Sequence, residues 1–324
     1  MSLGAAEGAM IRLAHVVNPV DMPPSSDLRR AQPITFESMR VARELARPVA
    51  DVALVATRFP EDRGVETRGF LETPELTRSV LDVARFREAR KLPLVRDILD
   101  RAHEVAPEAD YLVYTNVDIA LMPHFYVTVA GLLAVGHDAV IINRRTIPGH
   151  YEGPDQLPLM WAELGKAHPG HDCFVFRRDR LPDFELGSAC VGMLWIGKIL
   201  GLNVAARADR CLLLEKSHLT FHVGEEEPTK DERFSDFHEH NLNETRQALH
   251  ALETRFGSID ARPCVDVFTR RLFATHTPPP AHVRVVRRLG GMVGPWVAPW
   301  IRGARVRSPR FDRFLRRTRP GQGS

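Results

Sequence analysis

Residues 111–118 have the sequence YLVYTNVD, in which an apolar run leads directly into an amide and a carboxylate. The apolar part predicts a buried central strand over 111–114. In open α/β sheets, ligands bind beyond the carboxyl ends of the strands, so Asp118 is placed for chemistry rather than for packing. Asn116 and Asp118 offer oxygen ligands to Mg²⁺ or Mn²⁺. The alternative is a local turn or helix cap, which Asn and Asp also favour.

Apolar periodicity on both sides of this segment predicts an α/β protein with a Rossmann-like, mostly parallel sheet flanked by helices. Strands alternate with amphipathic helices, and β-α-β units favour parallel strands joined by right-handed crossovers. Further strands are predicted at 11–17, 52–56, 79–84, 139–142, 173–176, 204–206 and 212–214. Helices are predicted at 35–46, 90–105, 123–135, 189–200 (ending at Gly201) and 233–256. The irregular stretch 143–170 suggests a functional loop over the sheet edge.

Composition places the chain among soluble globular proteins, with 44% hydrophobic and 26% charged residues over 324 positions. No apolar run approaches the roughly 20 residues that span a bilayer, and no secretory signal is evident at the N-terminus. A cytoplasmic location is therefore expected. The four cysteines are far apart in sequence, which predicts reduced and mostly buried thiols.

The C-terminal residues differ in charge from the rest of the chain. Residues 282–324 hold eleven arginines and one acidic residue, while the whole chain has a net charge of +3. Three prolines at 278–280 predict a stiff spacer, so we divide the chain into a domain at 1–276 and a basic tail at 277–324. The tail also contains Trp296 and Trp300, and this composition suits an anionic membrane surface. The alternatives are a solvated tail and, less favoured, nucleic-acid binding.

Several short motifs occur in an order that resembles the GT-A family of glycosyltransferases. They are NPV at 18–20, RKLPL at 90–94, TNVDI at 115–119, PGHDCFVF at 169–176, VGMLW at 191–195, and the histidines His218 and His222. The resemblance covers about residues 11–225 and rests mainly on this order. It implies a GT-A-like fold, a nucleoside diphosphate sugar as donor, and a divalent metal bound by Asp118, with Asn18 and Asn116 beside the donor.

Two departures from the family pattern bear on the chemistry. Asn116 stands where a strict DxD motif has its first Asp, which lowers the negative charge of the metal site. The segment 192–195 lacks the acid that many inverting relatives use as a base. The candidates for a catalytic acid or base are therefore Asp172, Asp183 and Glu185. Asp172, which precedes a buried strand, is predicted to contact the acceptor hydroxyl; the alternative is a turn residue.

Basic residues and histidines complete the predicted site. Arg144 and Arg145 follow the strand at 139–142 and suit the oxygens of a diphosphate. In an extended segment His218 and His222 point to the same face. The resemblance assigns His222 to the metal or the diphosphate, and His218 is expected in the core. No dinucleotide-binding, P-loop or nucleophile-elbow motif is present.

These features predict a metal-dependent glycosyltransferase that moves a sugar from a nucleoside diphosphate to an unidentified acceptor. A non-catalytic protein that binds sugar nucleotides or carbohydrates would use the same scaffold, and Asn116 favours it. A metal-dependent hydrolase built on His168, His171 and Asp172 is the third hypothesis.

Overall fold

The computed structural model describes residues 10–168, 170–224, 232–260, 262, 264 and 265. The chain divides into two units, Met1–Arg270 and Arg271–Ser324. The boundary predicted at 276/277 and the basic tail lie outside the described residues, as does Pro169 of the PGHDCFVF motif.

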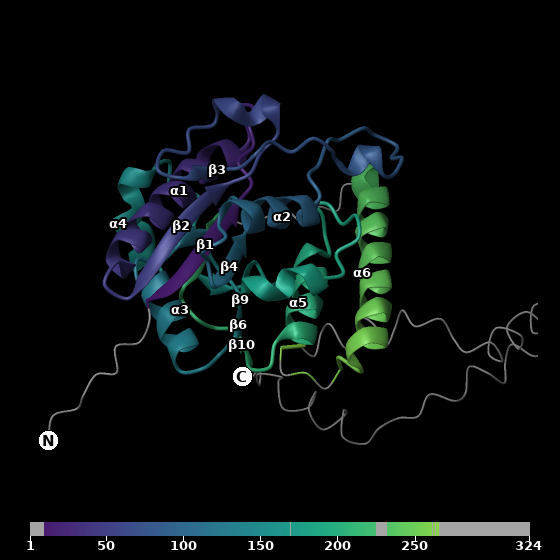
Figure 1. Cartoon of the computed structure of the whole chain (residues 1–324). Coiled ribbons are helices and arrows are strands. Elements are labelled where there is room, and N and C mark those ends of the chain that lie inside the picture. The colour runs from purple at the N-terminus through teal and green to yellow at the C-terminus, as the bar shows by residue number, and fades with distance from the viewer. Residues whose placement is uncertain (1–9, 169, 225–231, 261, 263, 266–324) are drawn as a thin grey trace, which may run out of the picture. The chain divides into compact units, whose positions relative to one another are not determined.

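A seven-stranded sheet forms the centre of the first unit, with strand order β10-β6-β9-β4-β1-β2-β3 (Figure 1). Only β9 runs antiparallel to its neighbours, β4 and β6, so the sheet is mostly parallel, as predicted. The strands are β1 (Ile11–Val17), β2 (Ala50–Ala56), β3 (Leu71–Glu72), β4 (Tyr111–Thr115), β6 (Ala139–Ile142), β9 (Cys173–Arg177) and β10 (Cys211–Leu214).

Helices cover both faces of this sheet (Figure 1). Alternate strand residues such as Leu13, Val113 and Val175 pack with α1 and α3 on one face. On the other face α2 contacts β1 and β4, α5 contacts β9, and α6 packs on α5. The helices are α1 (Asp27–Ala46), α2 (Val95–Val105), α3 (Phe125–Ala134), α4 (Leu157–Ala162), α5 (Ile196–Arg207) and α6 (Ser235–Phe256). The 3₁₀ helices are Pro60–Gly64, Val80–Asp82, Pro154–Gln156, Arg178–Asp183 and Glu232–Phe234.

The segments that follow β4, β6 and β10 contribute strands to a second, smaller sheet. Its order is β5-β11-β7-β8, with β5 (Ala120–Leu121), β7 (Arg145–Ile147), β8 (Lys166–Ala167) and β11 (Thr220–Val223). Strand β11 runs antiparallel to β5 and parallel to β7. The stretch 143–170, predicted as irregular, therefore contains β7, α4 and β8.

The strand predicted at 79–84 is wrong, because a local cap forms there instead. Ser79 accepts a hydrogen bond from the Leu81 N–H, and the Asp82 carboxylate accepts one from the Ser79 N–H. This reciprocal capping box starts the 3₁₀ helix Val80–Asp82. The third strand of the central sheet is the short β3 at Leu71–Glu72.

Three predicted helix boundaries were also wrong. The helix predicted at 90–105 is α2, which begins only at Val95. The helix predicted at 189–200 is α5, which begins at Ile196 and contains both Gly201 and the strand predicted at 204–206. Gly201 therefore lies inside the helix and does not cap it, and a Cβ there would meet the Phe174 ring at 3.9 Å, an ordinary contact distance. Helix α1 begins at Asp27 and continues through Pro33, eight residues before the predicted start at Thr35.

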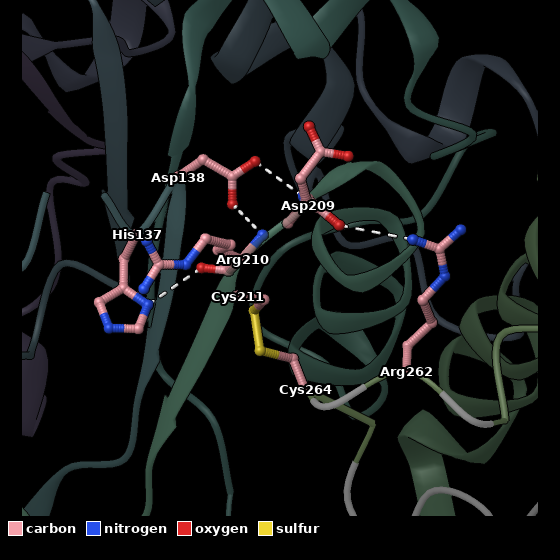
Figure 2. The surroundings of a disulfide bond; sticks show 8 residues. His137, Asp138, Asp209, Arg210, Cys211, Arg262 and Cys264 are labelled. Carbon is pink, nitrogen blue, oxygen red and sulfur yellow. Dashed lines mark hydrogen bonds between the residues drawn. A yellow bond between two sulfur atoms is a disulfide. The ribbon is translucent and has the colours of Figure 1, made fainter. Parts of the chain in front are cut away.

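A disulfide joins Cys211, the first residue of β10, to Cys264 (Figure 2). The prediction of reduced thiols is therefore wrong for this pair, whereas Cys173 and Cys190 are free and buried, as predicted. The Asp138 carboxylate accepts the backbone N–H groups of Asp209 and Arg210, which fixes the start of β10 beside the bridge. The two cysteines are 53 residues apart, and only the tertiary fold brings them together.

No helix in the described part of the chain is both long and apolar enough to cross a membrane. The cytoplasmic location stays a prediction.

The Cys211–Cys264 disulfide leads to a prediction for the number of reactive thiols and for the stability of the fold. Under denaturing conditions without reductant, two thiols per chain should react with a thiol reagent, and four should react after reduction. A loop of 53 residues corresponds to about 4 kcal/mol of unfolding free energy at 25 °C on the chain-entropy model. Replacing Cys211 and Cys264 by Ser should lower the free energy of unfolding by up to that amount, measured by denaturant titration. A double variant at Cys173 and Cys190 is the control for the thiol count, since it should leave no reactive thiol before reduction. Four reactive thiols in the unreduced wild type would contradict the bridge.

Candidate functional site

The chain leaves the central sheet at the carboxyl ends of three strands and enters the smaller sheet each time. Strand β4 continues through Asp118 to β5, β6 continues through Arg144 to β7, and the segment after β10 leads to β11 with His222. The carboxyl ends of parallel strands share one edge of the sheet. The strand order also reverses between β1 and β4 at this edge, which is where ligands bind in open α/β sheets.

Asp118 and His222, both predicted as metal ligands, form a close pair. The Asp118 Oδ2 lies 3.4 Å from the His222 Nε2, and both side chains are largely buried. Burial by itself raises the pKa of Asp118, but hydrogen bonding and charge interaction with His222, aided by Arg144, bring that pKa below its usual range. Burial lowers the pKa of His222, and the interactions with Asp118 outweigh it, so that this pKa is raised. The two groups therefore stabilise each other's charged forms.

The orientation of His222 is fixed by its other ring nitrogen. Nδ1 lies 2.7 Å from the Gly224 carbonyl oxygen, which only accepts hydrogen bonds, so Nδ1 carries a proton. Nε2 therefore faces Asp118. Metal-binding histidines commonly donate their other N–H to a backbone carbonyl in this way.

The donor set of this pair fits part of a divalent metal shell. It supplies one carboxylate and one imidazole, and further oxygen ligands would have to come from a bound molecule or water. Among the described residues there is no group of three or more His, Cys, Asp or Glu side chains that could hold a metal.

A second buried pair, Arg144 and Asp172, follows from the antiparallel contact of β6 with β9. Ile142 pairs with Cys173 at the end of the ladder, and Arg144 and Asp172 lie just beyond it. The Arg144 Nη1 lies 3.0 Å from the Asp172 Oδ1, with side chains only 3% and 11% exposed. His168 Nδ1 lies 3.7 Å from the other carboxylate oxygen of Asp172.

The other predicted site residues, Asn18, Asn116 and Arg145, make hydrogen bonds outside these two pairs. The Asn18 amide donates to the Thr57 carbonyl at 2.6 Å, linking the segments after β1 and β2. Asn116 accepts a hydrogen bond from the Tyr114 hydroxyl at 3.2 Å. The Arg145 guanidinium donates to the backbone carbonyls of Leu164 and Gly165, next to β8. The structure therefore brings Arg144, but not the Arg145 guanidinium, to the Asp118 pair.

The other candidate acids and His218 lie in different surroundings. Asp183 binds Arg207 of α5, and both Asp183 and Glu185 bind Arg255 of α6. His218 precedes β11, and burial together with Arg145 and His124 lowers its pKa. The extended geometry predicted for the segment around His222 is confirmed by β11.

A buried network beneath the site was missed by the sequence analysis. His15 of β1 lies 2.7 Å from the Tyr126 hydroxyl through Nδ1 and 2.9 Å from the Thr115 hydroxyl through Nε2. Thr115 ends β4 and directly precedes Asn116, so this network ties the start of the site to β1 and α3. A histidine inside the apolar run at 11–17 was the available signal, since a buried imidazole needs polar partners.

A hollow of about 450 Å³ lies beside the segments that follow β2 and β3. Four of its charged groups form pairs, Arg58 with Glu72 and Arg63 with Glu75. These pairs hold the loop at 57–76 together, and the hollow adds no reactive group to the site.

Comparison with known proteins finds solved structures that resemble this chain at low sequence identity. No family model and no curated protein matches the chain. Similar solved structures include Staphylococcus aureus TarS 1–349 in complex with UDP-GlcNAc, at 9% identity over 75% of this chain and 71% of that one, with a TM-score of 0.43. Mycobacterium tuberculosis glucosyl-3-phosphoglycerate synthase has 17% identity over 78% and 83% of the two chains, with a TM-score of 0.38. A putative nucleotide-diphospho-sugar transferase from Desulfovibrio desulfuricans G20 has 15% identity over 73% and 97%, with a TM-score of 0.33.

All three TM-scores are below 0.5, and the α/β fold class is established by the chain's own sheet.

The His15 network predicts a pH dependence of stability. Burial lowers the pKa of His15 to about 3, against 6.5 for an exposed histidine. Between these values the unfolded chain binds a proton that the folded protein does not, so the free energy of unfolding falls as pH decreases from 6.5 toward 3. The slope from this residue is at most about 1.4 kcal/mol per pH unit. Denaturant titrations of wild type and His15→Gln across this range should differ by that slope. Replacement of the exposed His250 is the control and should keep the wild-type slope; an unchanged slope in His15→Gln would show that His15 is protonated in the fold.

Proposed function

We propose that the protein is a glycosyltransferase that moves a sugar from a nucleoside diphosphate to an acceptor hydroxyl, with a divalent metal held by Asp118 and His222. The observation that supports this most directly is the Asp118–His222 pair beside Arg144, just beyond the central strand and at the reversal of strand order. A carboxylate, an imidazole and a guanidinium at one place suit a metal ion and a diphosphate together.

Each group has a distinct role in binding the donor. Asp118 and His222 would hold Mn²⁺ or Mg²⁺ through an oxygen and a nitrogen. Arg144 would face the diphosphate oxygens, which match the planar guanidinium. Asn18 and Asn116 follow β1 and β4 on the two sides of the reversal and would line the donor site. When bound, the ion would offset the negative charge that develops on the leaving diphosphate.

Asp172 is the acid that is bound to Arg144. Two roles are open to it: contact with the acceptor hydroxyl, as the sequence predicts, or support of Arg144, to which it is bound. The first role requires a carboxylate that can take up a proton, whereas the second requires one that keeps its charge.

A non-catalytic sugar-nucleotide binding protein is the second candidate function. Asn116 in place of an acid favours it, and so does the absence of an acid from 192–195. The two functions differ in one measurable property, because only the enzyme should hydrolyse a bound donor slowly when no acceptor is present.

Replacement of Asp118 tests the donor site. Asp118→Ala should abolish metal-dependent binding of nucleoside diphosphates, measured by calorimetry with and without Mn²⁺, because it removes the only acid of the proposed metal pair. Asp110→Ala is a matched control at the opposite end of β4, where the carboxylate binds the exposed Arg12. The control should bind like wild type. Unchanged affinity of Asp118→Ala in the presence of Mn²⁺ would refute the assignment.

The basic segment at 282–324 suggests that the acceptor is at or near a membrane. Each basic residue close to an anionic surface contributes roughly 1 kcal/mol, and the effect is screened by salt. We therefore expect the full chain to sediment with phosphatidylserine vesicles at low salt, and a chain truncated after Pro280 to stay in solution while keeping donor hydrolysis. Failure of the full chain to sediment, or unfolding of the truncated chain, would rule out this role.

A further inference from the structure

The Arg144–Asp172 pair is a charged contact inside the fold whose position is set by the backbone. The Asp172 N–H donates to the Ile142 carbonyl at 3.4 Å, and the His168 N–H donates to the Arg144 carbonyl at 3.1 Å. The segments before β9 and after β6 are therefore held against each other. Because both side chains are nearly buried, neither can swing into water to find another partner.

Arg144 lies next to the neighbouring pair. It directly precedes Arg145, which pairs with Phe221 where β7 runs parallel to β11, and His222 is the next residue of β11. One end of the guanidinium is taken by the Asp172 Oδ1 at 3.0 Å. A guanidinium bound to a carboxylate on one side has a fixed plane, and its other N–H groups point in fixed directions.

Asp172 is poorly suited to act as a base in this position. A carboxylate bound to a buried guanidinium holds its charge and takes up a proton less readily than a solvated one. Removing one partner of such a pair leaves an uncompensated buried charge, which is strongly unfavourable. Keeping Arg144 charged and oriented is thus the role that its contacts support.

We infer that Asp172 is a positioning residue, which holds the Arg144 guanidinium toward the diphosphate of the donor, and that it does not itself contact the acceptor. This inference rests on the proposed function, because it presumes a diphosphate ligand beside Asp118 and His222. It replaces the acceptor role that the sequence suggests for Asp172. It also separates two neighbouring arginines, since the guanidinium of Arg145 binds the carbonyls at 164 and 165 and has no such role.

The test compares nucleotides that differ only in the terminal phosphate. Uridine, guanosine and adenosine diphosphates are first titrated into the full-length wild type with Mn²⁺, and the base that binds is chosen. Its diphosphate and monophosphate are then titrated into Asp172→Asn, Arg144→Lys and the double variant, with Arg145→Lys as the matched control. Circular dichroism and thermal unfolding verify the fold of each variant.

We expect Asp172→Asn and Arg144→Lys to weaken diphosphate binding by about 10-fold to 100-fold, the range for losing hydrogen bonds to a charged group. Monophosphate affinity should change by less than about threefold, because a nucleoside monophosphate lacks the terminal phosphate that Arg144 is proposed to bind. The double variant should be no weaker than the weaker single variant, since the two residues act as one unit. Arg145→Lys should bind both nucleotides like wild type.

Three results would overturn the inference. If Asp172→Asn keeps wild-type diphosphate affinity while donor hydrolysis or transfer falls, Asp172 belongs to the acceptor side. If both nucleotides weaken equally, the pair is only structural. If Asp172→Asn does not fold, Arg144→Lys decides, because it keeps a buried cation for Asp172 and loses only the planar fork; diphosphate affinity equal to wild type would then refute the role. A wild type that binds none of the diphosphates refutes the proposed function itself, before any variant is compared.

Discussion

Asp118 and His222 meet because the chain leaves the central sheet beyond β4 and β10 and pairs again in the smaller sheet. The antiparallel pairing of β5 with β11 aligns Ala120 with Phe221, and Asp118 and His222 lie close to that rung. Strand β11 is also parallel to β7, which begins directly after Arg144. Three chain crossings at one sheet edge thus bring an acid, an imidazole and a guanidinium together. Ionised groups at this depth persist only when they are paired, so the smaller sheet is a condition for the charged site.

The side of the site next to β9 is shaped by helices rather than by strands. A Cβ on Gly197 would lie 2.5 Å from the His171 carbonyl oxygen, so the first turn of α5 packs directly against the backbone before Asp172. Trp195, just ahead of this turn, has a φ of 83°, an unfavourable value for a non-glycine residue. The buried Asn241 of α6 holds the preceding loop by donating to the carbonyls of Cys190 and Leu194 at 2.9 and 3.0 Å. Helix α6 therefore stabilises the strained segment that leads into α5 beside Asp172.

The sequence was most informative where local pattern and tertiary environment agree. The strands at 11–17, 111–114 and 139–142 are mostly apolar, and the structure buries all of their residues except Ile11, Arg12 and Tyr111. The errors at 79–84 and 189–200 arise where apolar content is compatible with several structures, and at 79–84 the Ser79 cap decides between them. The smaller sheet has strands of two to four residues, too short for a periodic signal.

The site residues could be predicted one by one, because each flanks or lies in a predicted strand or matches the motif order. They are Asp118, Arg144, Asp172 and His222. Their pairing into Asp118–His222 and Arg144–Asp172, like the pairing of Cys211 with Cys264, depends on contacts between distant segments that no local pattern contains.

The charge balance of the site has a consequence for how a donor would bind. Without ligand, Asp118 is offset by His222, whose pKa is raised, and Asp172 is offset by Arg144. Each of these two buried acids thus has a basic partner. On the proposed function, a divalent ion alone would displace the proton from His222 and add charge beside Arg144, whereas a diphosphate alone would add negative charge beside Asp118. The ion and the diphosphate carry opposite charges, so each would compensate the charge that the other adds to the site. Because coupling between two ligands is reciprocal, metal and diphosphate should each raise the affinity of the other.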